Sequence, residues 1–144
     1  MFGRRKRQIA CILVVEDDPL IAFDTEHMLG DAGYDVIATV DRVADALAVL
    51  ARDSKVDLVL ADINLADGSG VDVARAARAK DIPVLFVTGS CPVEARALAA
   101  GCLAKPYATR DLGAAIAAID TVLQGGKPPR RLPAGFSLFL EAAA

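Results

Sequence analysis

The sequence has no tryptophan, only one histidine and few aromatic residues (5%), yet 54% of it is hydrophobic. Its core must therefore be built from aliphatic side chains. No stretch approaches the roughly 18 consecutive apolar residues of a membrane span. The first apolar run is interrupted at Glu16-Asp17-Asp18, too early for a signal peptide. We therefore expect a cytoplasmic protein without membrane contact.

A strong positive charge is also missing. The formal net charge is −3, which argues against direct nucleic-acid binding. Basic residues gather at positions 4–7 and 127–131, and we interpret both groups as solvated ends of the chain. The cysteines are odd in number and have no CxxC spacing, so we expect them to be reduced: Cys11, Cys91 and Cys102.

The 144 residues, about the size of one domain, show an alternation of two patterns. Short apolar runs, typical of buried strands, lie at Ile9–Val15, Asp35–Ala38, Val56–Ala61, Pro83–Thr88 and Cys102–Ala104. Segments with helical spacing lie between and after them, at Leu20–Ala32, Arg42–Asp53, Val71–Lys80, Pro92–Ala100 and Arg110–Leu123. Continuous apolar strands separated by helices predict an α/β fold with a doubly wound parallel sheet and helices on both faces.

Polar residues follow four of the five predicted strands. Glu16-Asp17-Asp18 follows the first, Asp62 the third, Thr88 ends the fourth, and Lys105 follows the fifth. Each has an ordinary structural explanation when taken alone, and we expect Asp18 to be the N-cap of the helix that begins at Pro19. Because the carboxyl ends of parallel strands meet at one sheet edge, the residues together predict a site for a hard divalent cation, most plausibly Mg²⁺.

Four motifs in this order, ILVVEDDP, DINLADGSG, VTG and KPY, resemble the receiver domain of bacterial two-component response regulators. The resemblance runs from about Ile9 to Leu123. It implies a flavodoxin-like fold, a five-stranded sheet in the order 2-1-3-4-5. It also implies partners: a sensor histidine kinase or a histidine phosphotransfer protein.

The resemblance also implies a role for each motif residue. Asp62 matches the phospho-acceptor, and Glu16 and Asp17 match the metal-binding acids. The backbone carbonyl of Asn64 matches the third metal ligand. Thr88 and Lys105 match the residues that contact the phosphoryl group.

A carboxylate can attack phosphorus and form an aspartyl phosphate, while a cation and an ammonium neutralise charge. This self-phosphorylation and self-dephosphorylation chemistry is not that of a conventional enzyme. Gly89 leaves an approach path to Asp62. Ser90 and Asn64 flank that path, where they are expected to tune the access of water.

One position departs from the family. Cys102 stands three residues before Lys105, where the family often has an aromatic residue that rotates on phosphorylation. We therefore expect the phosphorylated state to be read through Thr88, the 89–92 loop and the helix predicted at Pro92–Ala100.

We divide the chain into a basic arm (1–8), a receiver domain (9–124) and a Gly/Pro-rich linker with an apolar tail (125–144). The last twenty residues are too few for a DNA-binding module, so we expect a stand-alone receiver that signals through an output protein or a homodimer. Whether the apolar cluster Phe136–Leu140 is a frayed end or a docking segment is left open.

Two other functions compete with a phosphorylatable receiver. The first is a receiver-like interaction module that does not cycle phosphate, which the complete set of site residues disfavours. The second is an Mg²⁺-dependent hydrolase with an aspartyl-phosphate intermediate. A hydrolase of this kind needs a general acid two residues after Asp62, and that position is Asn64.

Overall fold

The computed structural model describes residues 7–52 and 55–140, so most of the predicted basic arm lies outside the described residues. Its centre is a six-stranded sheet in the order β2-β1-β3-β6-β7-β8. The first five strands in that order are parallel, and β8 is antiparallel to β7. The strands are β1 (Cys11–Val15), β2 (Asp35–Val40), β3 (Leu58–Ala61), β6 (Val84–Thr88), β7 (Gly101–Ala104) and β8 (Phe136–Leu138). The predicted fold class and order of parallel strands are confirmed, with one additional strand at the β7 edge.

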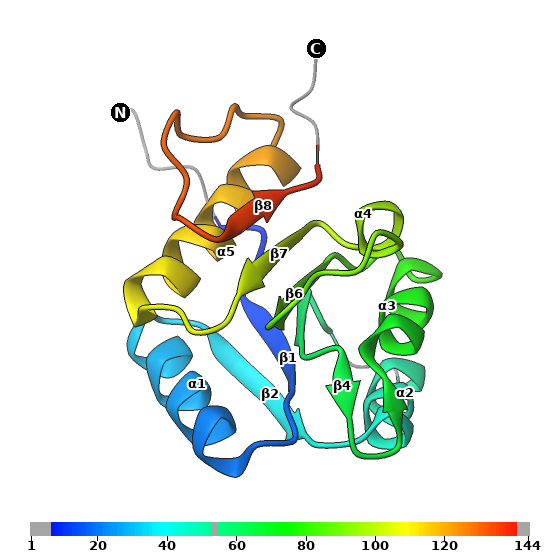
Figure 1. The fold of residues 1–144 in the computed structure, drawn as a ribbon. Helices are drawn as coiled ribbons and strands as arrows, with labels where there is room; N and C mark the ends of the chain where they lie inside the picture. The colour runs from blue at the N-terminus through cyan, green and yellow to red at the C-terminus, as the bar shows by residue number, and fades with distance from the viewer. Residues whose placement is uncertain (1–6, 53–54, 141–144) are drawn as a thin grey trace.

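Helices cover both faces of this sheet (Figure 1). They are α1 (Pro19–Asp31), α2 (Val43–Ala51), α3 (Gly70–Arg78), α4 (Ala95–Leu98) and α5 (Thr109–Leu123). One hydrophobic cluster joins the sheet to α2, α3 and α4, and the other joins it to α1 and α5. No helix in the part of the chain that the structure describes is long and apolar enough to cross a membrane.

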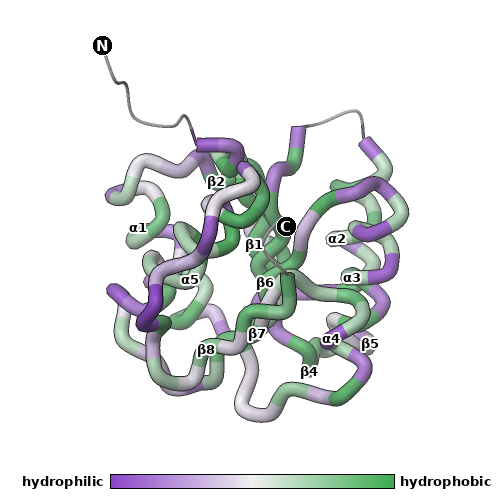
Figure 2. The backbone as a smooth tube through the Cα atoms, turned by 90° about the horizontal axis from the view of Figure 1, so that it is seen from above, coloured by the Kyte–Doolittle hydropathy of each residue, from purple (hydrophilic) through white to green (hydrophobic). Residues whose placement is uncertain are grey.

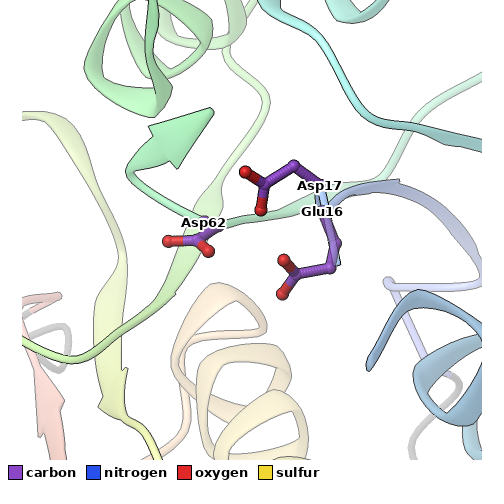
Figure 3. Close-up of side chains that lie close together, drawn as sticks. All are labelled: Glu16, Asp17 and Asp62. Atoms are coloured by element: carbon purple, nitrogen blue, oxygen red, sulfur yellow. The ribbon is translucent and has the colours of Figure 1, made fainter. Parts of the chain in front are cut away.

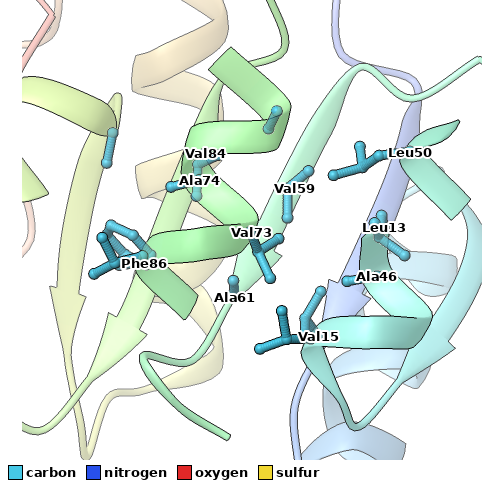
Figure 4. Close-up of a cluster of buried hydrophobic side chains, with 14 of the residues drawn as sticks. Leu13, Val15, Ala46, Leu50, Val59, Ala61, Val73, Ala74, Val84 and Phe86 are labelled. Carbon is cyan, nitrogen blue, oxygen red and sulfur yellow. The ribbon is translucent and has the colours of Figure 1, made fainter. Parts of the chain in front are cut away.

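Strand β1 shows why the central strands are continuously apolar. Leu13 and Val15 belong to the cluster under α2 and α3, whereas Ile12 and Val14 belong to the opposite cluster. Both faces of the strand are therefore removed from water, as parallel sheets require. Figure 4 shows the first of these clusters between the sheet and the helices. In Figure 2 the apolar colour accordingly concentrates along the strands in the middle of the molecule.

The first helix begins as expected. The side chain of Asp18 accepts hydrogen bonds from the backbone N–H groups of Leu20 (2.9 Å) and Ile21 (3.3 Å), and Pro19 opens the helix. Proline has no N–H to lose at this position, and the Asp18 carboxylate supplies partners that the first turn lacks. The N-cap prediction is confirmed, and α1 therefore starts directly beside the acidic residues that follow β1.

The fourth helix is much shorter than predicted. Only Ala95–Leu98 is α-helical, whereas the sequence pattern predicted Pro92–Ala100. The preceding residues form i→i+3 hydrogen bonds instead, such as the one from Ala95 N to Pro92 O (3.1 Å). The helix ends early because the N–H of Ala100, the residue directly before β7, already donates to Val84 O at the start of β6 (2.8 Å).

The apolar tail lies on the sheet, as the strand β8. Phe136 is buried in the cluster of α1 and α5, and Phe139 packs against the cluster on the other face. Gly101 permits this approach, because a Cβ atom there would lie 2.8 Å from the ring of Phe136. The described part of the tail, up to residue 140, is thus a docked segment that covers the outer edge of β7.

Candidate functional site

Three carboxylates meet at the carboxyl edge of the sheet. Glu16 and Asp17 follow β1, Asp62 follows β3, and each contributes an oxygen that lies within 4.8 Å of the other two (Figure 3). Glu16 is buried and Asp17 is exposed, so the group opens to solvent on one side. A set of three hard oxygen ligands with one open side suits a small divalent cation that keeps part of its water shell.

The backbone around Asp62 is positioned by two neighbouring contacts. Its N–H continues the β1–β3 pairing by donating to Val15 O (2.9 Å). Its carbonyl is covered by Gly70 at the start of α3, where a Cβ atom would lie only 2.1 Å from that oxygen. Any larger residue than glycine at position 70 would displace the acid, a constraint that sequence reasoning missed although this Gly lies within the motif DINLADGSG.

Lys105 joins two of the acids. Its Nζ donates to Glu16 Oε1 (2.8 Å) and to Asp62 Oδ2 (3.0 Å). The other oxygen of Glu16 accepts the N–H of Asp18 (3.1 Å), so both carboxylate oxygens of Glu16 have partners. The predicted phospho-acceptor, metal-binding acid and lysine are therefore in direct contact, although 89 positions separate Glu16 from Lys105 in the chain.

The electrostatics of this contact follow from burial. Burial raises the pKa of Glu16 above its ordinary value, and the hydrogen bond from Lys105 only partly opposes the rise. Burial lowers the pKa of Lys105, but the hydrogen bonds to Glu16 and Asp62 outweigh it, so this pKa is raised. The site thus combines a protonated ammonium with a buried carboxylate whose ionised form is disfavoured by burial. Additional positive charge would stabilise that carboxylate.

Thr88 lies at the end of β6 with its side chain directed into the protein. It is 1% exposed, and its hydroxyl donates to Ser90 O (3.4 Å) in the following loop. Gly89 leaves open space where a side chain would stand, and Ser90 is exposed. Among the described residues, no hydrogen bond joins Thr88 to the acids, so the hydroxyl can change partner when a new acceptor arrives.

Cys102 occupies a core position on β7 opposite Phe86. It is 3% exposed, and burial together with the neighbouring Cys91 thiol raises its pKa. A protonated, enclosed thiol has little reactivity. The small side chain belongs to the same cluster that Phe139 of the tail packs against. The tail therefore places an aromatic ring against the face on which Cys102 stands.

A cavity of about 460 Å³ adjoins Lys105 between α1 and the start of α5. Apolar residues line much of it, among them Ile21, Met28 and Tyr107. Sequence reasoning assigned no role to Tyr107, although its place directly after Lys105-Pro106 was a usable signal. Burial raises the pKa of this phenol, while a hydrogen bond with Thr25 opposes the rise.

A family model of the response regulator receiver domain matches residues 12–117. The chain belongs to this family. The match includes the acids after β1 and β3, the end of β6 and the lysine after β7. The recognition made from the four motifs is thereby confirmed, and the domain is consistent with two-component signalling.

Relatives with longer chains share this domain. The phyllosphere-induced regulator PhyR of Methylorubrum extorquens is 38% identical over 79 residues, 54% of this chain and 30% of its own length. The transcriptional regulatory protein PdtaR of Mycobacterium tuberculosis is 32% identical over 111 residues, 73% of this chain and 54% of its own. The chain thus spans between about a third and half of the length of these relatives.

Solved receiver structures have the same fold. A response regulator receiver protein from Sinorhizobium medicae superimposes with a TM-score of 0.68 at 28% identity, covering 77% of this chain and 94% of its own. The non-phosphorylated HemR receiver domain from Leptospira biflexa gives a TM-score of 0.69 at 26% identity, covering 85% of this chain and 99% of its own. Both solved chains are matched over nearly their entire length, so the fold that they share is present in this chain.

Proposed function

We propose that this receiver accepts a phosphoryl group on Asp62 from a histidine kinase or a histidine phosphotransfer protein. One observation supports this most directly: the Lys105 ammonium lies 2.8 Å from Glu16 and 3.0 Å from Asp62 at the edge where the three acids meet. That arrangement combines a nucleophile with a cation that can neutralise the transferred group.

Glu16, Asp17 and the backbone carbonyl of Asn64 are the residues that would hold Mg²⁺. The acids suit the ion because their oxygens gather within 4.8 Å, and Asn64 stays close to them through the hydrogen bond from its N–H to Asp62 Oδ1 (3.3 Å). When bound, the ion supplies positive charge to the phosphoryl oxygens.

In the transfer step, an Asp62 oxygen forms a bond to phosphorus while the bond between phosphorus and the donor imidazole breaks. The imidazole leaves with the electron pair of that bond. The Lys105 ammonium already contacts one oxygen of Asp62 and can shift to a phosphoryl oxygen, where it would neutralise the transferred negative charge. Gly89 leaves the approach open, and Ser90 and Asn64 border it and tune the later attack by water.

Thr88 is the residue proposed to report the modified state. Its hydroxyl exchanges the weak bond to Ser90 O for a phosphoryl oxygen, which draws the loop after β6 toward the site. Because Cys102 is a small core residue, no aromatic ring rotates at that position. The displacement would instead pass to α4, where Arg96 stacks on Phe139 of the tail (5.7 Å from the guanidinium carbon to the ring centroid).

The partners follow from this chemistry. Because the proposed donors carry phosphohistidine made from ATP, we propose that the domain acts in the cytoplasm. The signal would leave through contact with an output protein, through a homodimer or by relay of the phosphoryl group. We propose no direct contact of this domain with nucleic acid or membrane.

The decisive experiment is incubation with a small acyl phosphate and Mg²⁺, followed by intact-mass measurement. We expect one added phosphoryl group in the wild type, none without Mg²⁺ and none in Asp62→Asn. A second receiver that is known to be labelled under the same conditions serves as the positive control. An unmodified wild type beside a labelled control would contradict phosphoryl acceptance and favour an interaction module.

A further inference from the structure

The short hairpin after Asp62 is fastened to a helix elsewhere in the chain. It consists of β4 (Asn64–Leu65) and β5 (Gly68–Ser69), and Asp67 stands in the turn between them. The Asp67 carboxylate accepts the N–H groups of Val43 (2.6 Å) and Ala44 (3.1 Å), the first two residues of α2. Figure 1 shows β4 on the same side of the sheet as α2 and α3.

Helix α2 depends on this contact for its cap. Its own N-cap residue, Arg42, has extended backbone angles but makes no capping hydrogen bond with its side chain. Asp67 therefore performs from 24 positions away what an N-cap residue usually does within the helix. The N–H groups of Ala44 and Val43 hold the pKa of Asp67 below its ordinary value, so the carboxylate is charged at neutral pH.

The hairpin needs an anchor at its tip, because each strand has only two residues and such a ribbon is marginal by itself. Its base is secured beside Asp62 by the hydrogen bond from Gly70 N to Ile63 O (2.7 Å). The buried side chain of Leu65 fastens one side, and Asp67 fastens the turn. Asn64, whose carbonyl is the proposed metal ligand, lies between these anchors.

We infer that Asp67 is a positioning residue that keeps the Asn64 carbonyl in place for the divalent cation by tying the hairpin to the start of α2. The inference rests on the proposed function, since it assumes that Asn64 contributes to a metal site. It extends that function to a residue that neither touches the acids nor contacts the phosphoryl group. Residues that hydrogen-bond to metal ligands commonly change metal affinity by about 10- to 100-fold, and for Asp67, which acts through the hairpin, we expect the low end of that range.

A helix cap and a tether can be separated by moving the cap. Arg42→Ser places a good N-cap side chain within α2 itself, at a residue whose extended backbone suits that role. In the double variant Asp67→Ala/Arg42→Ser the helix is capped again, but the hairpin has lost its anchor. The double variant also keeps the wild-type net charge, because one acidic and one basic residue are removed together.

The test measures two quantities on the four proteins: unfolding by urea, and Mg²⁺ binding to the unphosphorylated protein by calorimetric titration. We expect Asp67→Ala to be less stable and to bind Mg²⁺ about 10-fold more weakly. In the double variant we expect stability to return while Mg²⁺ affinity stays low. Arg42→Ser alone provides the reference for any direct effect of the lost arginine.

If Mg²⁺ affinity recovers together with stability in the double variant, Asp67 acts only as a helix cap and the inference is overturned. Unchanged Mg²⁺ affinity in Asp67→Ala would also overturn it. If Asp67→Ala does not fold, Asp67→Asn keeps one acceptor oxygen and takes its place in the comparison. Absence of Mg²⁺ binding in the wild type would instead contradict the metal site of the proposed function, so the two failures are distinguishable.

Discussion

Replacing Lys105 with Met should reveal how much the acidic site depends on its own lysine. The ammonium lies 2.8 Å from Glu16 and 3.0 Å from Asp62, which corresponds to about 6 kcal/mol of attraction for each pair at an effective dielectric constant near 20. Most of this is offset by desolvation of the three groups. The larger effect of the substitution is that Glu16, with a side chain only 6% exposed, loses its cation. We expect a loss of about 3 kcal/mol in the free energy of unfolding, the low end for a broken buried pair because the ammonium is 21% exposed.

This loss should depend on pH in a defined direction. Burial raises the pKa of Glu16, and Lys105→Met removes the hydrogen bond that opposes the rise. A carboxyl group with a raised folded-state pKa destabilises the fold while it is ionised, and this penalty decreases as the pH falls from that pKa to the lower unfolded-state pKa, below which it is absent. The pKa of Lys105 is also raised, so the lysine stabilises the fold by a constant amount at any pH below its unfolded-state pKa. The difference between wild type and variant should therefore shrink as the pH falls from neutral toward 4.5, the ordinary pKa of a glutamate side chain.

Urea unfolding followed by circular dichroism, without Mg²⁺, measures this difference. With a slope of about 2 kcal/mol per molar urea, the expected shift of the midpoint is about 1.5 M. Lys55→Met is the matched control, because Lys55 is 72% exposed and lies 3.9 Å from Asp57, a surface pair worth under about 1 kcal/mol. The reasoning is refuted if Lys105→Met costs no more than the control, or if its cost is the same at both ends of the pH range.

Three further predictions concern the metal, the readout and the tail. Asp17→Asn should raise the stability of the fold without Mg²⁺, because it removes one of three neighbouring negative charges. In the wild type, Mg²⁺ at several-fold excess over Kd should stabilise the fold by about 1 kcal/mol, and the variant should lose this effect. If Mg²⁺ shifts the melting temperature equally in variant and wild type, the metal binds elsewhere. Thr88→Val removes the hydroxyl but keeps the shape of the side chain. When beryllofluoride is added as a phosphoryl mimic, amide exchange across Cys91–Ala104 should change in the wild type but not in Thr88→Val. A change that persists in the variant would refute the proposed route. Phe136→Ala should cost about 3 kcal/mol in urea unfolding and expose the β8 amides to exchange, whereas the exposed Ser137→Ala should do neither; equal stability of the two variants would mean that β8 does not contribute to the fold.

The sequence by itself determined the order of strands and helices and the edge at which the site forms. The reason is geometric: in a parallel sheet the carboxyl ends of all strands lie at one edge, so Glu16, Asp62 and Lys105 converge whatever the details of the loops. The N-cap at Asp18 was also predictable, because its hydrogen bonds reach only two and three residues along the chain.

Only the tertiary structure decided the contacts between distant segments. The pairing of β8 with β7 depends on whether an edge is free and whether Gly101 lets Phe136 approach, and no local pattern reports either condition. Helix α4 is short because the N–H of Ala100 donates to Val84 O in the sheet, and this hydrogen bond overrides the helical spacing of the preceding residues. The cap of α2 comes from Asp67 rather than from Arg42, because the fold of the hairpin brings a carboxylate to N–H groups that the local sequence leaves without a side-chain partner. A hydrogen bond between near neighbours in the chain can be predicted from the local sequence. The contacts between distant segments depend instead on which edges and surfaces the packed sheet and helices leave open.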